Sequence, residues 1–156
     1  MATRTVQLRV ADARDIDAVE QVMAAAFDPR FGEAWTRNQA LGVLAMPGVR
    51  LTLALVDEAP AGFAMVRAIM DEAELLLLAV APTHRRTGVG GALLRSAEAD
   101  CTDRGVRKFH LEVRAGNPAV RLYTAHRFAQ VGERRGYYRG REGKLFDAHT
   151  YAKALG

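Results

Sequence analysis

Residues 75–94 read LLLLAVAPTHRRTGVGGALL, and this stretch sets the architecture that we expect for the chain. An apolar run stops abruptly, becomes basic, turns glycine-rich and restarts as an apolar helix. An uninterrupted apolar run with polar residues at both ends is typical of a strand covered on both faces. The stretch therefore predicts a central strand, an anion-binding turn and a helix, in a sheet that needs helices on each side.

The glycines of the turn indicate a ligand that approaches the main chain closely. A side chain at Gly88, Gly90 or Gly91 would hold the ligand away, whereas bare amides at a helix start can point several N–H groups at one anion. The helix dipole and the side chains of Arg85 and Arg86 act in the same direction. We expect a phosphate or pyrophosphate here, although glycines that only permit close packing of the strand on the helix would give the same pattern.

Two better-known phosphate motifs do not fit this turn. The P-loop requires Lys and then Ser or Thr after its last glycine, whereas Gly90 is followed by Gly91 and Ala92. The dinucleotide fingerprint requires a third glycine where this chain has Leu93. Glu112 lies at a suitable distance downstream for a ribose contact, but it falls inside its strand pattern rather than at the end.

Length and composition predict one globular domain, residues 1–156. The chain has 156 residues, of which 49% are hydrophobic and 26% charged, and these values exclude disorder and fibrous repeats. The single cysteine, Cys101, cannot form an internal disulfide, and its place on the apolar side of a predicted helix favours core packing. We find no metal-spaced set of Cys and His, so no metal is expected.

Charge and hydropathy indicate the partners and the compartment. The stretch from Met1 to Leu8 has no apolar core of signal-peptide length, and no run elsewhere reaches bilayer length. We therefore expect a cytoplasmic protein without membrane contact. The net charge of +4 favours an anionic partner, which could be a nucleotide-like cofactor, RNA or a ribosome.

The remaining periodicity predicts alternating strands and helices around the central strand. The predicted elements are a strand at 6–10, helices at 12–27 and 33–46, strands at 51–55 and 63–69, the central strand at 75–80, a helix at 88–104, a strand at 109–113, a helix at 117–126, and strands at 128–132 and 146–154. The first strands should form an antiparallel meander, with a turn at 58–62. The strand, helix and strand from 75 to 113 should form a right-handed crossover between parallel neighbours, with a ligand crevice at their carboxyl ends.

The segment RRTGVG, residues 85–90, resembles the Arg/Gln-x-x-Gly-x-Gly/Ala signature of the GNAT superfamily of acyl-CoA-dependent N-acyltransferases. The resemblance implies an α/β (α+β) fold with a mixed, mostly antiparallel sheet of six to seven strands. It also implies that the turn holds the pyrophosphate of coenzyme A, while the preceding strand pairs with the pantetheine arm. The cofactor-binding residues implied in this way are Leu78, Ala79, Val80, Arg85, Arg86, Thr87, Gly88, Val89, Gly90, Gly91 and Asn117.

Acyl transfer from a thioester to an amine needs a neutral amine, a stabilised oxyanion and a proton for the departing thiolate. Glu112 is the expected base, because LEVRA at 111–115 resembles the same string in the RimI-type ribosomal-protein alanine N-acetyltransferases, in which the glutamate accepts the proton. By periodicity alone Glu112 could equally be a solvated strand position. Tyr123 is the expected acid, because Leu122-Tyr123 resembles the family's Leu-Tyr pair, although a tyrosine here could simply pack on the sheet.

Further segments resemble the RimI-type group, and others depart from it. ERRGYY at 133–138 resembles a segment near the substrate, and Trp35 resembles a tryptophan that begins the second helix. The interval from Asn117 to Tyr123 is one residue shorter than usual, so either the helix is shortened or Gly116 takes the asparagine's place. Arg127 replaces a glycine, which requires a different helix ending or a strained left-handed residue. The tail 147–151 is more polar than the apolar last strand of the family.

The resemblance implies a cytoplasmic, acetyl-CoA-dependent N-acetyltransferase that acts by direct attack in a ternary complex. The expected acceptor is the N-terminal amine of a protein, such as an alanine of a ribosomal protein. The alternatives are a relative acting on a small-molecule amine such as a polyamine or aminoglycoside, an acyl-CoA-binding module without turnover, and an RNA-binding protein. We expect a monomer or homodimer and consider nucleic acid the less favoured partner.

Overall fold

A computed structural model describes residues 5–156 of the chain. The first four residues, which belong to the stretch expected to lack a signal peptide, lie outside the described residues. The strands are β1 (Val6–Ala11), β2 (Val49–Val56), β3 (Ala59–Ile69), β4 (Glu72–Val80), β5 (Lys108–Arg114), β6 (Ala129–Arg139) and β7 (Leu145–Ala154). The α-helices are α1 (Ile16–Ala26), α2 (Arg37–Leu44), α3 (Val89–Asp103) and α4 (Val120–Ala125). Short 3₁₀ turns occupy Ala13–Asp15, Pro29–Phe31 and Pro82–His84.

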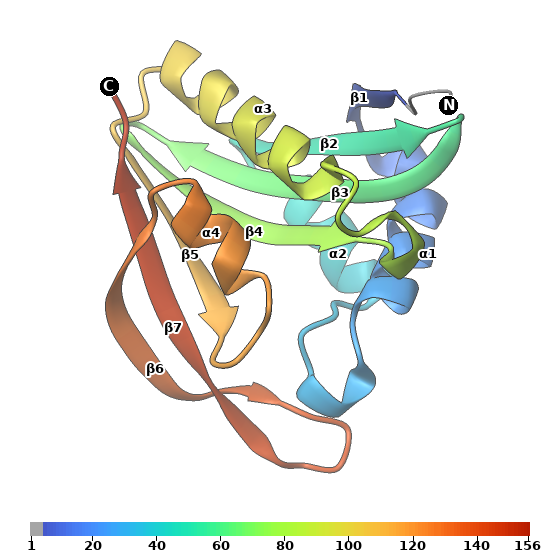
Figure 1. Cartoon of the computed structure of the whole chain (residues 1–156), viewed down its shortest axis with the longest axis vertical. Helices are drawn as coiled ribbons and strands as arrows, with labels where there is room; N and C mark the ends of the chain where they lie inside the picture. Colours follow the sequence, from blue (N-terminus) through green and yellow to red (C-terminus); the bar gives the residue numbers. More distant parts are fainter. Residues whose placement is uncertain (1–4) are drawn as a thin grey trace.

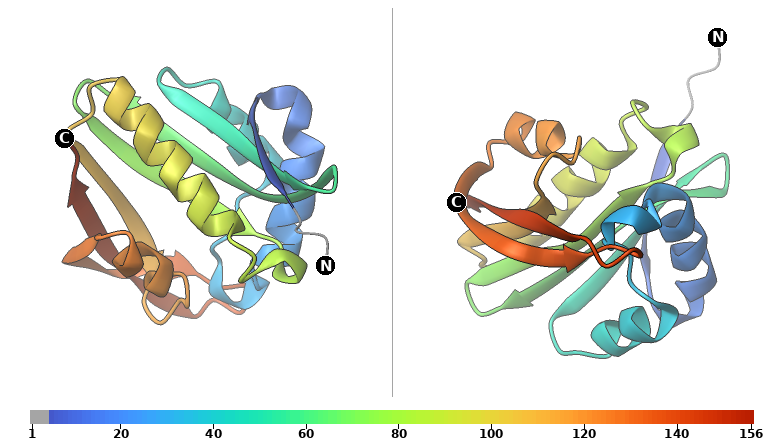
Figure 2. Two further views of the ribbon diagram at one scale, coloured as in Figure 1. Left: turned by 45° about the horizontal axis from the view of Figure 1, so that its top comes forward. Right: turned by 90° about the horizontal axis from the view of Figure 1, so that it is seen from below.

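The strands form one seven-stranded sheet in the order β1-β2-β3-β4-β5-β7-β6. Every neighbouring pair is antiparallel except β4 and β5, which are parallel and joined through α3. Helices α3 and α4 lie on one face, and α1 and α2 lie on the other (Figures 1 and 2). The expected mixed sheet with one parallel crossover and helices on both faces is confirmed.

The sheet separates two apolar cores. Leu93, Cys101 and Phe109 belong to the core beneath α3, while Val19 and Phe63 belong to the core beneath α1. All five are fully buried. Cys101 is therefore a core residue, as its position in the helix pattern predicted, and burial raises the pKa of its thiol to about 11.

Several predicted boundaries were wrong, and capping explains most of them. Asp12 caps a 3₁₀ turn rather than α1 itself. The second helix begins only after Thr36, because Thr36 and Gln39 form a capping box, so Trp35 lies in the preceding loop. The short helix begins at Val120 instead of residue 117, because the Asn117 side chain accepts a hydrogen bond from the Ala119 amide and closes a separate turn.

Two predicted strand boundaries also changed. The turn expected at 58–62 is a two-residue turn at Asp57 and Glu58, both with positive φ, so β3 already begins at Ala59. Residues 134–139 do not interrupt β6 but continue it, with a bulge between Arg134 and Tyr138, where Gly136 has a φ of 62°. Arg127 adopts the left-handed conformation, with a φ of 68°, which is one of the two outcomes expected for a non-glycine residue there.

Candidate functional site

A cleft opens where β4 and β5 separate. The two strands pair only from Glu72 with Lys108 to Leu75 with Leu111, although both continue further. The next residue of β4, Leu76, is the extra residue of a bulge against β3, which bends the strand. The cleft is lined by Phe27, Glu33, Trp35, Glu74, Leu75, Leu76, Leu77, Leu78, Leu111, Glu112, Val113, Asn117, Ala119, Tyr123, Tyr137 and Tyr138.

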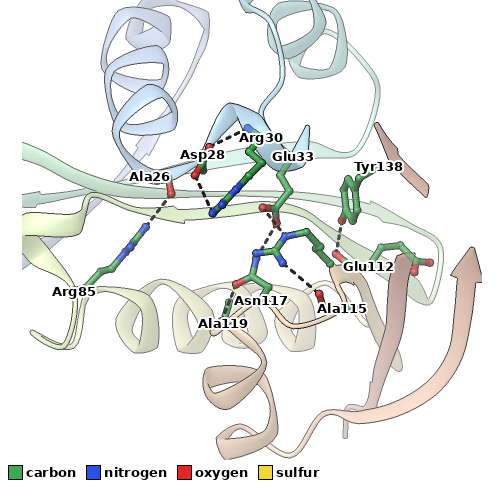
Figure 3. A network of polar contacts seen from close by, with 11 residues as sticks. Ala26, Asp28, Arg30, Glu33, Arg85, Glu112, Ala115, Asn117, Ala119 and Tyr138 are labelled. Atoms are coloured by element: carbon green, nitrogen blue, oxygen red, sulfur yellow. Dashed lines mark hydrogen bonds and ion pairs between the residues drawn. The ribbon is translucent and has the colours of Figure 1, made fainter. Parts of the chain in front are cut away.

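Glu112 follows the last paired residue of β5 and lines this cleft. Its side chain is 9% exposed, and both carboxylate oxygens accept hydrogen bonds. Arg134 Nε donates to Oε1 at 3.0 Å, and Thr150 Oγ1 donates to Oε2 at 2.6 Å. In Figure 3 the side chain extends away from the contacts made by Glu33. The protein thus holds the predicted base in one fixed orientation at the cleft wall.

Tyr123 reaches the same cleft from α4. The residue is 6% exposed, its ring packs edge-on against Phe128 with centroids 6.0 Å apart, and its hydroxyl forms no hydrogen bond within residues 5–156. Burial raises the pKa of the phenol above its ordinary value, and the nearby charge of Glu33 acts in the same direction. The hydroxyl is therefore protonated at neutral pH and available to a ligand.

A polar network that the sequence did not predict joins Glu33 and Asn117, which both line the cleft, to Arg114 (Figure 3). Glu33 accepts hydrogen bonds from Arg114 Nε at 3.1 Å and from Asn117 Nδ2 at 2.8 Å. The Arg114 guanidinium also lies over the ring of Phe31, 3.7 Å from its centroid. The network ties the loop between α1 and α2 to the loop after β5. The capping box at Thr36 is the sequence signal that could have placed Glu33 in that loop rather than in a helix.

The bulge in β6 brings two tyrosines to the opposite wall. Tyr138 Oη donates to the main-chain oxygen of Glu112 at 3.4 Å, and the half-exposed Tyr137 packs edge-on against Tyr138. Asp147 of β7 supports the bulge, because its Oδ1 accepts a hydrogen bond from the Gly136 amide at 2.9 Å. Burial raises the pKa of both phenols, as do nearby carboxylates, which are Glu74 and Glu112 for Tyr137.

The predicted anion-binding turn leads from β4 into α3. Within the described part of the chain, the amide N–H groups of residues 86–91 form no hydrogen bond of normal geometry. Gly88 has a φ of 87° and open space where a side chain would stand. Gly90 instead packs closely, because a Cβ there would lie 3.1 Å from Leu122 Cδ2. The turn thus has free amide donors and open space at Gly88 and close packing at Gly90. Both interpretations of its glycines apply, each at a different residue.

The other predicted cofactor residues lie around this turn. Leu78, Ala79 and Val80 occupy the part of β4 beyond its pairing with β5, and Leu78 lines the cleft. The Arg85 guanidinium donates to the main-chain oxygen of Ala26 at 2.9 Å, which ties the turn to the end of α1 (Figure 3). Thr87 Oγ1 donates to the main-chain oxygen of His84.

Residues 5–156 contain neither a candidate metal site nor a candidate membrane span. These residues form no group of three or more His, Cys, Asp or Glu side chains that could hold a metal ion. In the same range, no helix is long and apolar enough to cross a membrane.

Comparison with known proteins finds clear relatives. Residues 16–128 match the model of the acetyltransferase (GNAT) family. Over 85 residues the chain is 40% identical to the [ribosomal protein bS18]-alanine N-acetyltransferase of Escherichia coli strain K12, a match that covers 54% of this chain and 57% of the relative. The chain thus spans only a little over half the length of that relative. A Bacillus subtilis protein that is named provisionally for the same activity is 31% identical over 126 residues. This match covers 80% of this chain and 81% of the Bacillus subtilis protein.

Solved structures extend the similarity to nearly the whole chain. The crystal structure of the ribosomal-protein-S18-alanine N-acetyltransferase from Escherichia coli superposes with a TM-score of 0.85 and 27% identity, covering 97% of this chain and 95% of the other. Arabidopsis thaliana NAA60 in complex with a bisubstrate analogue gives a TM-score of 0.84 at 21% identity, covering 97% and 99%. The second likeness concerns the fold alone.

Proposed function

Because this chain belongs to the acetyltransferase (GNAT) family, we propose that it is an acetyl-CoA-dependent N-acetyltransferase acting on a protein N-terminal α-amine. One observation carries the proposal. A turn of free amides and a cleft bearing Glu112 and Tyr123 occupy the same end of a splayed parallel strand pair. The relatives named for alanine acetylation of ribosomal protein bS18 support this acceptor for the present chain, and such an acceptor would place the protein in the cytoplasm.

The turn would hold acetyl-CoA through its diphosphate. The free amides of residues 86–91 and the positive end of α3 suit a doubly charged anion. Main-chain groups of Leu78 to Val80 face the gap left by β5 and would pair with the pantetheine arm. The amide near Val80 would then stabilise the oxyanion. Asn117 would contribute only by exchanging its present partners, Glu33 and the Ala119 amide.

The chemistry would be a direct attack of the amine nitrogen on the thioester carbonyl. Glu112 takes a proton from the amine, directly or through one water, because an α-amine with a pKa near 7.7–8.0 is partly protonated at neutral pH. The carbon–sulfur bond breaks as the tetrahedral intermediate collapses. Tyr123 donates its hydroxyl proton to the departing thiolate, because the phenol is protonated at neutral pH and lines the cleft in which the thiolate forms.

A small-molecule amine is the second candidate acceptor, and the charge of the cleft favours it. Three glutamates line the cleft, whereas no Lys, Arg or His among the described residues does. Arg114 and Arg134 neutralise two of these carboxylates, Glu33 and Glu112. The third, Glu74, has only His110 Nε2 nearby, at 3.9 Å, and could attract the second ammonium of a polyamine.

A thiol-release screen with acetyl-CoA distinguishes these functions. Short peptides that differ in their first residue are compared with polyamines and aminoglycosides at equal concentration. We expect the highest kcat/KM with peptides that begin with alanine. Faster thiol release with a polyamine would show that the acceptor is a small-molecule amine. No release with any amine would contradict both and leave a binding module, whose affinity would depend steeply on salt if its ligand were RNA.

A further inference from the structure

The last strand along the chain, β7, carries the polar residues 147–151 that depart from the family pattern. Thr150 of β7 pairs in register with Glu112 of β5 on one side and with Gly132 of β6 on the other. Residues opposite each other on neighbouring strands point to the same face of the sheet. The hydroxyl of Thr150 therefore lies on the face that carries the Glu112 carboxylate.

The contact between these two side chains is short and directional. Thr150 Oγ1 lies 2.6 Å from Glu112 Oε2, a distance typical of a hydroxyl that donates to a charged oxygen. An ionised carboxylate can only accept, so the hydroxyl proton must point toward Glu112. The β-branched side chain has few allowed rotamers, which keeps that donor in place.

The second donor to Glu112 is held less firmly. The Arg134 side chain is 62% exposed, whereas that of Glu112 is 9% exposed. The exposed guanidinium of Arg134 reaches one carboxylate oxygen from the solvent side, whereas the half-buried Thr150 holds the other oxygen from within the sheet. The carboxylate has about four acceptor positions, so two remain for a proton from the substrate.

We infer that Thr150 is a positioning residue for the reaction, holding Oε2 of Glu112 so that the carboxylate faces the acceptor amine. The inference rests on the proposed function, in which Glu112 is the base. Thr150 itself touches no reacting atom. It acts by holding the carboxylate of Glu112 in position. This contact gives a polar residue of β7 a role at the cleft.

Steady-state kinetics of Thr150→Val and Thr150→Ser test the inference. Valine keeps the shape and removes the hydroxyl, and serine keeps the hydroxyl. We expect Thr150→Val to lower kcat about tenfold while the KM for acetyl-CoA stays within about twofold, and Thr150→Ser to retain most of the wild-type kcat. Thr52→Val, the same change at a half-buried position of β2, should leave kcat unchanged.

A double-mutant cycle separates positioning from a general structural effect. In a Glu112→Gln background, adding Thr150→Val should change kcat by less than about twofold, because the group that Thr150 orients has already lost its function. A folded Thr150→Val variant with wild-type kcat would overturn the inference. A further tenfold loss of kcat when Thr150→Val is added to Glu112→Gln would also overturn it. Glu112→Gln with full activity, or a wild-type protein inactive toward every amine, would instead overturn the proposed function and this inference with it.

Discussion

Glu112 and Tyr123 face one cleft but are held in different ways. The carboxylate of Glu112 has a donor on each oxygen, whereas the Tyr123 hydroxyl forms no hydrogen bond within residues 5–156. An acceptor held by two donors and an unoccupied donor in the same cleft suit a reaction in which one group removes a proton and the other supplies one. The raised pKa of Tyr123 keeps the phenol protonated at neutral pH, so its hydroxyl can donate a hydrogen bond to a thiolate that forms beside it.

Conservative substitutions of these two residues should separate binding from chemistry. We expect Glu112→Gln and Tyr123→Phe each to reduce thiol release about a hundredfold or more, because each removes one proton-transfer group. Both should keep the wild-type affinity for coenzyme A, measured by calorimetry. Tyr151→Phe, the same change at a tyrosine of the core that does not line the cleft, is the matched control and should stay active. Full activity of both cleft variants would refute the mechanism.

Sequence motifs predicted the two cleft residues Glu112 and Tyr123, which lie on a regular strand and a regular helix. Glu112 and Tyr123 were predicted from strings whose spacing fixes their strand and helix. Glu33 was not, because its contacts with Arg114 and Asn117 bridge segments more than 80 residues apart, and a loop conformation has no periodicity that predicts it. The Arg85 contact with Ala26 was missed for the same reason.

The turn between β4 and α3 is the element on which the cofactor proposal depends. Gly88 adopts a φ of 87° at the start of α3, a conformation that costs a residue with a side chain about 1–2 kcal/mol. This backbone arrangement leaves the following amides free. The glycine-rich string predicted the turn, but only the structure separates Gly88, which the backbone conformation requires, from Gly90, which packing requires.

Gly88→Ala should therefore weaken acetyl-CoA binding as well as stability. We expect the free energy of unfolding to fall by about 1 kcal/mol and the KM for acetyl-CoA to rise several-fold, because the amides lose their common direction. Gly143→Ala is the control, since Gly143 in the turn between β6 and β7 also has a positive φ, 83°, and open space around it. Denaturant unfolding should show a similar loss in both. An unchanged KM in Gly88→Ala, or an equal rise in Gly143→Ala, would argue against a diphosphate site in the turn.

At the scale of the whole molecule, the proposed function depends on the point where β4 and β5 stop pairing. The crossover from β4 through α3 to β5 was predictable from the order of apolar runs, because such connections are right-handed and join parallel neighbours. The point where the pairing stops was not predictable. Four consecutive leucines give no signal for the bulge at Leu76, since each fits either face of a buried strand.

The walls of the cleft come from segments distant in sequence. The loop between α1 and α2 provides Glu33, β6 provides Tyr137 and Tyr138, and β7 holds Glu112 through Thr150. The polar tail at 147–151, a departure from the family pattern, supports this arrangement through Asp147 and Thr150. The fold as a whole thus brings a carboxylate, a phenol and a row of free amides to one end of the sheet.

The central claim is that this cleft transfers an acetyl group to the α-amine of a peptide. The most direct measurement is tandem mass spectrometry of an alanine-initiated peptide that also contains lysine, after incubation with the protein and acetyl-CoA at neutral pH. We expect one acetyl group on the α-nitrogen, which has a lower pKa than the lysine amine, and none after reaction with Glu112→Gln. Acetylation of the lysine side chain, or recovery of the unmodified peptide, would contradict the account.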